Sequence, residues 1–208
     1  MIKSVTIISL VLVLALVLTA CGGPIKSEPV KEVFTGTSEE TLEDFLGAMG
    51  LDIMSFTNPV TAENVTGVLG LSTADFDKYI VNATSSVAAI MTHAHLVSAI
   101  ACVNPADAKT VKDLIAKGFD PARWICVFPE ECFVVEVGSY VFLVASTAEN
   151  AEMAKNALNT LAGDAVGEYN VFFTGAASGG GTAVGGMPVT PVAGDDTTAG
   201  NDGAIKLS

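Results

Sequence analysis

The sequence contains few of the residues from which most catalytic and metal sites are built. Its 208 residues include two histidines, one tryptophan and four cysteines. Positive charge is also scarce, because 10 basic residues stand against 23 acidic ones and the formal net charge is −13. Nucleic acids and anionic lipid surfaces bind basic faces, so we expect neither as a partner. The chain also lacks the Gly-Lys-Ser/Thr of a phosphate loop and the Gly-x-Ser-x-Gly of a hydrolase nucleophile turn.

Long apolar runs are missing except for one at the N-terminus, from Val5 to Ala20 behind Lys3. About 16 helical residues rise roughly 24 Å, which is short of the bilayer core of about 30 Å and typical of a signal peptide. The run ends in Leu18-Thr19-Ala20-Cys21. This pattern resembles the lipobox of bacterial lipoprotein signal peptides.

The lipobox resemblance implies that the chain is cut before Cys21 and that the Cys21 thiol carries a diacylglycerol. An uncleaved membrane anchor would need a longer run and a basic flank, and the 22–24 segment, Gly-Gly-Pro, is not basic. Two acyl chains hold a protein stably on a membrane. We therefore expect a mature protein lipid-anchored to the extracytoplasmic face of the cell membrane, with no cofactor beyond that lipid.

Composition divides the chain into four segments. After the signal peptide (1–20), the lipidated cysteine and a Pro-containing flexible linker occupy 21–36. Residues 37–174 are long enough to bury a core of their own and form one globular domain. The Gly/Ala/Thr/Asp-rich tail (175–208) has no aromatic residue and is expected to be disordered, because it can bury too little apolar surface to offset its conformational entropy.

Local signals in the domain predict both helices and strands. A capping box at Thr37–Glu40 begins a helix over 38–49, Pro105 begins a helix to about 117, and a second box at Ser146–Glu149 begins a helix to about 161. A weaker pattern predicts a short helix over 61–69. Strands are predicted over 79–83 and over 95–103. The segments 132–137 and 140–145 are predicted to form a hairpin with a type II′ turn at Gly138-Ser139. Residues 171–173 are expected to form an edge strand or an apolar segment that lies on the core.

These elements predict an α+β fold, a single domain with a small antiparallel or mixed sheet and helices packed on one face. The segments 79–87, 96–115 and 138–146, with the helix after the last, resemble an uncharacterised domain of lipoproteins from Gram-positive, mostly anaerobic bacteria. The resemblance implies a strand–helix–hairpin–helix body. It implies no activity and no functional residue, since that family has none assigned.

The two histidines, His93 and His95, are the weak candidates for a metal site. Side chains two apart on a strand point to one face and could share a metal ion. Catalytic zinc needs a third protein ligand, and Cys102 would face the opposite side of the same strand. The alternative is that both are polar residues at the start of a strand, and we expect no bound metal.

The cysteines and aromatic residues in and beside the 118–131 segment leave alternatives open. Cys126 and Cys132 could form a disulfide in an exported protein, or both could be small buried hydrophobic residues. No base near them in the sequence would activate a thiol nucleophile. Trp124 and Phe128 could form an exposed recognition patch, but we favour a place in the core.

The sequence is thus most consistent with a non-enzymatic binding or interaction module of the cell envelope. Such a module would meet an envelope protein or wall component through the sheet edge or the irregular 118–131 loop. A structural accessory lipoprotein is the first alternative. A metal- or thiol-dependent enzyme or sensor using His93 and His95 is the second.

Overall fold

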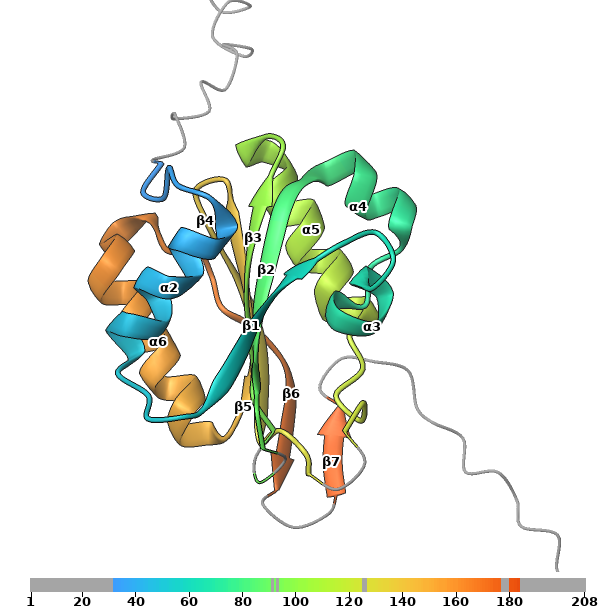
Figure 1. Ribbon diagram of the computed structural model, residues 1–208, viewed down its shortest axis with the longest axis vertical. Coiled ribbons are helices and arrows are strands. Elements are labelled where there is room, and N and C mark those ends of the chain that lie inside the picture. Colours follow the sequence, from blue (N-terminus) through green and yellow to red (C-terminus); the bar gives the residue numbers. More distant parts are fainter. Residues whose placement is uncertain (1–31, 91, 93, 125–126, 177–179, 184–208) are drawn as a thin grey trace, which may run out of the picture.

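The computed structural model describes residues 32–90, 92, 94–124, 127–176 and 180–183. In this part of the chain, one seven-stranded sheet forms the centre of a single α+β domain, which confirms the predicted fold class (Figure 1). All strand pairings are antiparallel, in the order β1-β2-β3-β5-β4-β6-β7. The strands are β1 (Ser55–Val60), β2 (Ile80–Ala88), β3 (Leu96–Cys102), β4 (Glu131–Val137), β5 (Tyr140–Ser146), β6 (Asn170–Ala176) and β7 (Gly180–Ala183).

Helices cover both faces of the sheet, so the prediction that they pack on one face is wrong (Figure 1). The physical reason lies in the central strands, since all seven residues of β3 and of β5 are buried and each face needs its own cover. One face carries α2 (Ser38–Met49) and α6 (Ala148–Ala162), with a 3-10 turn (Gly163–Ala165) after α6, and the other carries α3 (Val65–Leu69), α4 (Thr73–Tyr79) and α5 (Pro105–Gly118).

The central strands divide their side chains between two hydrophobic cores. On β5, Phe142 and Val144 belong to the core under α2 and α6, whereas Val141 and Leu143 belong to the core under α5. β4 alternates in the same way. Because strand side chains alternate between faces, a strand that is apolar throughout contributes to both cores at once.

Two helices with strong local start signals, α2 and α5, begin where the sequence predicts. Thr37 caps α2, and the Glu40 carboxylate in turn accepts the Thr37 N–H at 2.8 Å, which completes the predicted capping box. Gly50 ends α2 with a φ of 64°, a left-handed conformation that glycine adopts without strain. Pro105 is the first residue of α5, and Asp107 lies in its first turn.

The predicted hairpin is present as β4 and β5, each one residue longer than expected at its outer end. Gly138 has a φ of 62° and Ser139 does not have a positive φ, as a type II′ turn requires. Since Ser146 ends β5, it does not cap α6. Thr147 does, accepting the Asn150 N–H at 3.2 Å, so the predicted capping box at 146–149 is wrong by one residue.

Five other segments differ from the local predictions in their presence or in their bounds. β1 and α4 were not predicted. The helix expected over 61–69 begins only at Val65, because Asn64 accepts the Thr61 N–H at 2.9 Å and residues before Val65 form a turn. The strand expected over 79–83 is β2, which begins at Ile80 and continues to Ala88. The strand expected over 171–173 lies within β6.

The folded domain extends beyond both predicted boundaries. Phe34 packs edge-on against Phe142 with ring centroids 5.3 Å apart, and Ser139 donates to the Glu32 carboxylate at 2.8 Å. Residues 32–36 therefore belong to the domain, although composition placed them in the linker. β7 pairs with the end of β6, so this part of the predicted tail is strand. The rest of the linker and tail lies outside the described residues.

Candidate functional site

The candidate metal ligand His95 lies deep in the domain. It precedes β3 and is 1% exposed, and its Nδ1 has no hydrogen-bond partner among the described residues. Burial lowers the pKa of His95 to about 4, so the imidazole is neutral near pH 7. His93 lies outside the described residues. Within the described part of the chain, no three His, Cys, Asp or Glu side chains gather as a metal site would require.

The cysteines that the structure describes are buried thiols. Cys102 and Cys132 both belong to the core under α5. Burial raises the pKa of Cys102 to about 12 and raises that of Cys132 further, so both thiols are protonated at neutral pH and are weak nucleophiles. Cys126 lies outside the described residues, so a disulfide between Cys126 and Cys132 stays one of the two alternatives that the sequence leaves open.

The two aromatic residues of the 118–131 loop differ in exposure. Trp124 packs against the core under α5, with its ring 6.4 Å from that of Phe119, as predicted. Phe128 is 55% exposed, so its predicted place in the core is wrong.

The lipobox, Leu18 to Cys21, lies outside the described residues. No helix in the described ranges has the length and hydropathy needed to cross a membrane.

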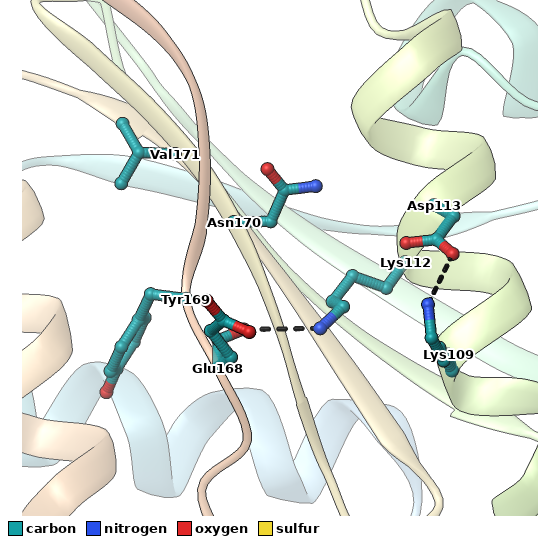
Figure 2. Close-up of a pocket in the computed structure, with 7 residues that line it drawn as sticks. All are labelled: Lys109, Lys112, Asp113, Glu168, Tyr169, Asn170 and Val171. Atoms are coloured by element: carbon teal, nitrogen blue, oxygen red, sulfur yellow. Dashed lines mark hydrogen bonds and ion pairs between the residues drawn. The ribbon is translucent and has the colours of Figure 1, made fainter. Parts of the chain in front are cut away.

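Two surface hollows in the described structure contain polar side chains that could meet a ligand. The first, of about 430 Å³, lies between α5 and the segment that leads into β6 (Figure 2). Lys109, Lys112 and Asp113 line it from α5, and Glu168 and Asn170 line it from the opposite side.

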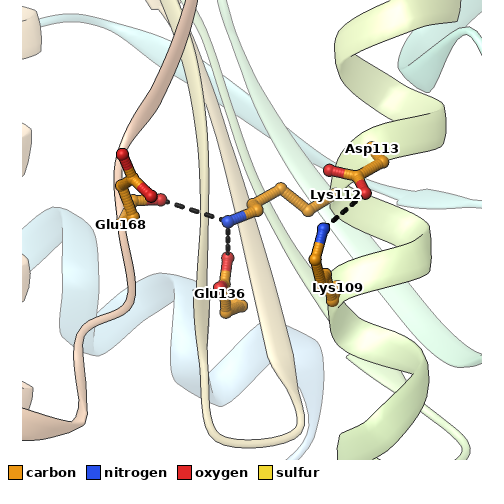
Figure 3. A network of polar contacts seen from close by, with 5 residues as sticks. All are labelled: Lys109, Lys112, Asp113, Glu136 and Glu168. Atoms are coloured by element: carbon orange, nitrogen blue, oxygen red, sulfur yellow. Dashed lines mark hydrogen bonds and ion pairs between the residues drawn. The ribbon is translucent and has the colours of Figure 1, made fainter.

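The two lysines of this first hollow already have partners within the protein (Figure 3). Lys112 is 7% exposed, forms an ion pair with Glu136 and donates to the Glu168 carbonyl oxygen at 3.2 Å. Lys109 pairs with Asp113 at 2.8 Å. A ligand would have to displace one of these contacts, so the arrangement is better suited to attaching α5 to the sheet than to binding.

The second hollow, of about 490 Å³, is a groove beside the β1 edge of the sheet. We call it the Arg123 groove. Asn58, Val60 and neighbouring residues of β1 and the following turn form one wall, Ser85 and Val87 of β2 line it, and Val68 and Arg123 complete it. The groove thus joins the two surfaces that the sequence singled out, the sheet edge and the 118–131 loop.

Arg123 provides the one guanidinium of the protein, since no other arginine occurs in the sequence. Its Nη1 donates to the Val68 carbonyl oxygen at 2.9 Å, and the guanidinium carbon lies 5.4 Å from the Trp124 ring centroid. Burial lowers the pKa of Arg123, yet a guanidinium stays charged at any physiological pH. Among the ion pairs of the described residues, none includes Arg123. In the described part of the chain, the groove therefore holds a partly desolvated positive charge that has no carboxylate within ion-pair distance, and Asp120 attracts it only from further away.

Neutral polar groups complete the groove. The Ser85 and Ser98 hydroxyls, on paired positions of β2 and β3, are hydrogen-bonded at 2.7 Å, and both residues are buried. The Asn64 amide donates to the Pro59 carbonyl oxygen at 3.3 Å, which holds the turn after β1 in place. Asn58 is exposed on β1 and makes no such internal contact among the described residues.

Sequence reasoning missed Arg123, although a signal was present. The only arginine in the sequence stands directly before the only tryptophan, within the proline-containing 118–131 loop.

Comparison with known protein families, curated proteins and solved structures finds no match to this chain.

Proposed function

We propose that the mature chain is a lipid-anchored, extracytoplasmic binding module of the cell envelope, and that the Arg123 groove is its ligand site. The observation that carries the site is a half-buried guanidinium with no carboxylate partner among the described ion pairs. Leaving a buried charge unpaired costs stability, so such an arrangement favours a ligand that supplies the missing anion. The lipobox at 18–21 supports the location, and membership of the lipoprotein family named above remains part of the proposal.

The groove favours binding over nucleophilic chemistry. Its polar residues are an arginine, amides and hydroxyls, which orient and neutralise a ligand. The thiols and the histidine of the described structure are buried elsewhere, in protonated and neutral forms that activate nothing at neutral pH. A structural accessory lipoprotein is the alternative, and it differs in requiring no occupant in the groove.

Site-directed photocrosslinking on intact cells tests this proposal. A benzophenone amino acid replaces Asn58 at the groove. In the matched control it replaces Glu152, whose side chain is 65% exposed on α6, on the opposite face of the sheet. We expect a saturable adduct from position 58 that is absent from position 152 and is lost when Arg123→Gln is added. Equal adducts from both positions, or none from position 58, would contradict a ligand site in this groove.

A further inference from the structure

Resting on the proposed function, we infer that the Arg123 groove takes a ligand bearing one carboxylate next to a short aliphatic group. This is the chemistry of the C-terminal residue of a peptide and of a free N-acylated amino acid. Three properties of the groove lead to it: the shape of its cation, the number of its charges and the character of its walls.

The shape of the cation favours a carboxylate. A guanidinium has five N–H donors in a planar fork that matches the two oxygens of a carboxylate. In Arg123 one donor is used by the Val68 carbonyl oxygen, which fixes the orientation of the fork, and the remaining donors are available to a ligand. The adjacent Trp124 ring shields the guanidinium from water and so strengthens its interaction with an anion.

The number of charges favours a single negative charge on the ligand. Arg123 is the only basic residue that lines the groove, and the protein as a whole has a net charge of −13. A phosphate monoester carries nearly two negative charges at neutral pH and would be compensated only by half. The net negative charge of the protein would repel a dianion more strongly than it repels a monoanion.

The Ser85–Ser98 pair offers a second donor when the Ser98 hydroxyl donates to Ser85. Two hydroxyls have two protons, and the mutual bond at 2.7 Å uses one of them. Both serines are buried, Ser98 at 0% exposure and Ser85 at 3%, and of the two Ser85 lines the groove. If Ser98 donates within the pair, the Ser85 proton points to an acceptor in the groove, and a carboxylate oxygen is such an acceptor.

The walls favour a short aliphatic group beside the carboxylate. Val60, Val68 and Val87 line the groove together with Pro59. These side chains offer apolar contact but no ring to stack on and no second charge. A branched aliphatic side chain placed against them gains free energy from buried apolar surface, which a purely polar anion such as inorganic phosphate does not.

Titration calorimetry on the full chain in mild detergent tests the inference, with N-acetyl-L-leucine against its amide N-acetyl-L-leucinamide. Loss of a charge-assisted contact predicts at least about tenfold weaker binding of the amide. Fluorescence of Trp124, the one tryptophan, reports whether binding occurs beside Arg123. A peptide that ends in leucine, with a free or an amidated C-terminus, distinguishes a peptide C-terminus from a free N-acylated amino acid as the ligand. A groove that binds peptides holds the free-acid peptide more tightly than N-acetyl-L-leucine.

Three variants localise the effect. Asn58→Asp places a competing carboxylate at an exposed position of the groove, where folding tolerates it. Arg123→Gln removes the cation. Each variant is expected to weaken N-acetyl-L-leucine binding about tenfold or more. Lys109→Gln, on the first hollow, is expected to leave binding unchanged.

Equal affinity for acid and amide, tighter binding of inorganic phosphate, or unchanged binding in Asn58→Asp and Arg123→Gln would each overturn the inferred ligand class. If the Asn58 photoadduct on cells nevertheless persists, the groove remains a ligand site and only the ligand class is wrong. If that adduct is also absent, the proposed function fails with it.

Discussion

A Cβ atom on Gly118 would lie 2.2 Å from the carbonyl oxygen of Gly70, so these two glycines bring the end of α5 into backbone contact with the turn after α3. Backbone atoms cannot retreat as a flexible side chain can. We therefore expect Gly118→Ala to lower the free energy of unfolding by about 2–3 kcal/mol, measured by urea denaturation. Gly47→Ala is the control, because a Cβ there meets nothing within 4 Å inside α2, and it should stabilise by about 0.5–1 kcal/mol.

The Lys112–Glu136 ion pair joins α5 to β4 in the interior, where its two charges depend on each other. The Lys112 side chain is 8% exposed and that of Glu136 is 27% exposed. Lys112→Met should lower the free energy of unfolding by about 2 kcal/mol, because it leaves Glu136 without its cation, and Lys112→Met with Glu136→Leu should recover most of that loss. Lys109→Met, in the exposed pair with Asp113, should change little in the same urea titration. A double variant as unstable as the single one would contradict this account.

Much of the fold follows from local signals that the chain carries in short stretches. Thr37 and Glu40 define one helix start, Pro105 defines another, and Gly138 allows one hairpin turn. β1 gave no such signal, since four of its six residues are exposed and its apolar residues do not alternate. α4 is short and buries none of its residues, so no apolar stripe marks it.

The placement of helices on both faces is encoded in the central strands and not in the helices themselves. The apolar residues of the strand predicted over 95–103 are consistent with a strand buried on both faces, and such a strand requires cover on both sides. Which helix covers which face depends on contacts distant in sequence, such as the bond from Ser38 to Thr84 at 2.7 Å, 46 residues apart. Periodicity within one element does not contain that information.

The candidate site was less predictable than the fold for the same reason. Val68 and Arg123, whose hydrogen bond closes the groove, are 55 residues apart in the chain. Sequence pattern instead drew attention to His93 and His95, close neighbours in the chain. The burial that makes His95 an unsuitable ligand at the surface comes from the tertiary packing around it, which residue spacing does not reveal.

His95 should make stability depend on pH. Its pKa is about 4 in the folded protein and 6.5 without the fold, so the unfolded chain binds the proton first. The His95 contribution is therefore fully present above pH 6.5, is lost at about 1.4 kcal/mol per pH unit as the pH falls, and levels off near pH 4. The measurement is the free energy of unfolding of the wild type minus that of His95→Gln across this range, in which the carboxylates common to both cancel. A difference that stays constant from pH 7.5 to 4 would show that His95 is not buried in its neutral form.

The anchoring proposal predicts that one sulfur atom determines where the protein resides. Acylation of Cys21 would add two hydrocarbon chains, enough for stable membrane attachment, to a body whose described helices cannot cross a bilayer. Wild-type protein should enter the detergent phase on Triton X-114 partitioning, with a mass that shows loss of residues 1–20 and gain of diacylglycerol. Cys21→Ser should stay uncleaved and unacylated, whereas Cys102→Ser, in the core under α5, should leave both properties unchanged even if it costs stability. A wild-type product with Met1 retained and an unmodified thiol at Cys21 would remove the basis for placing the Arg123 groove outside the cell.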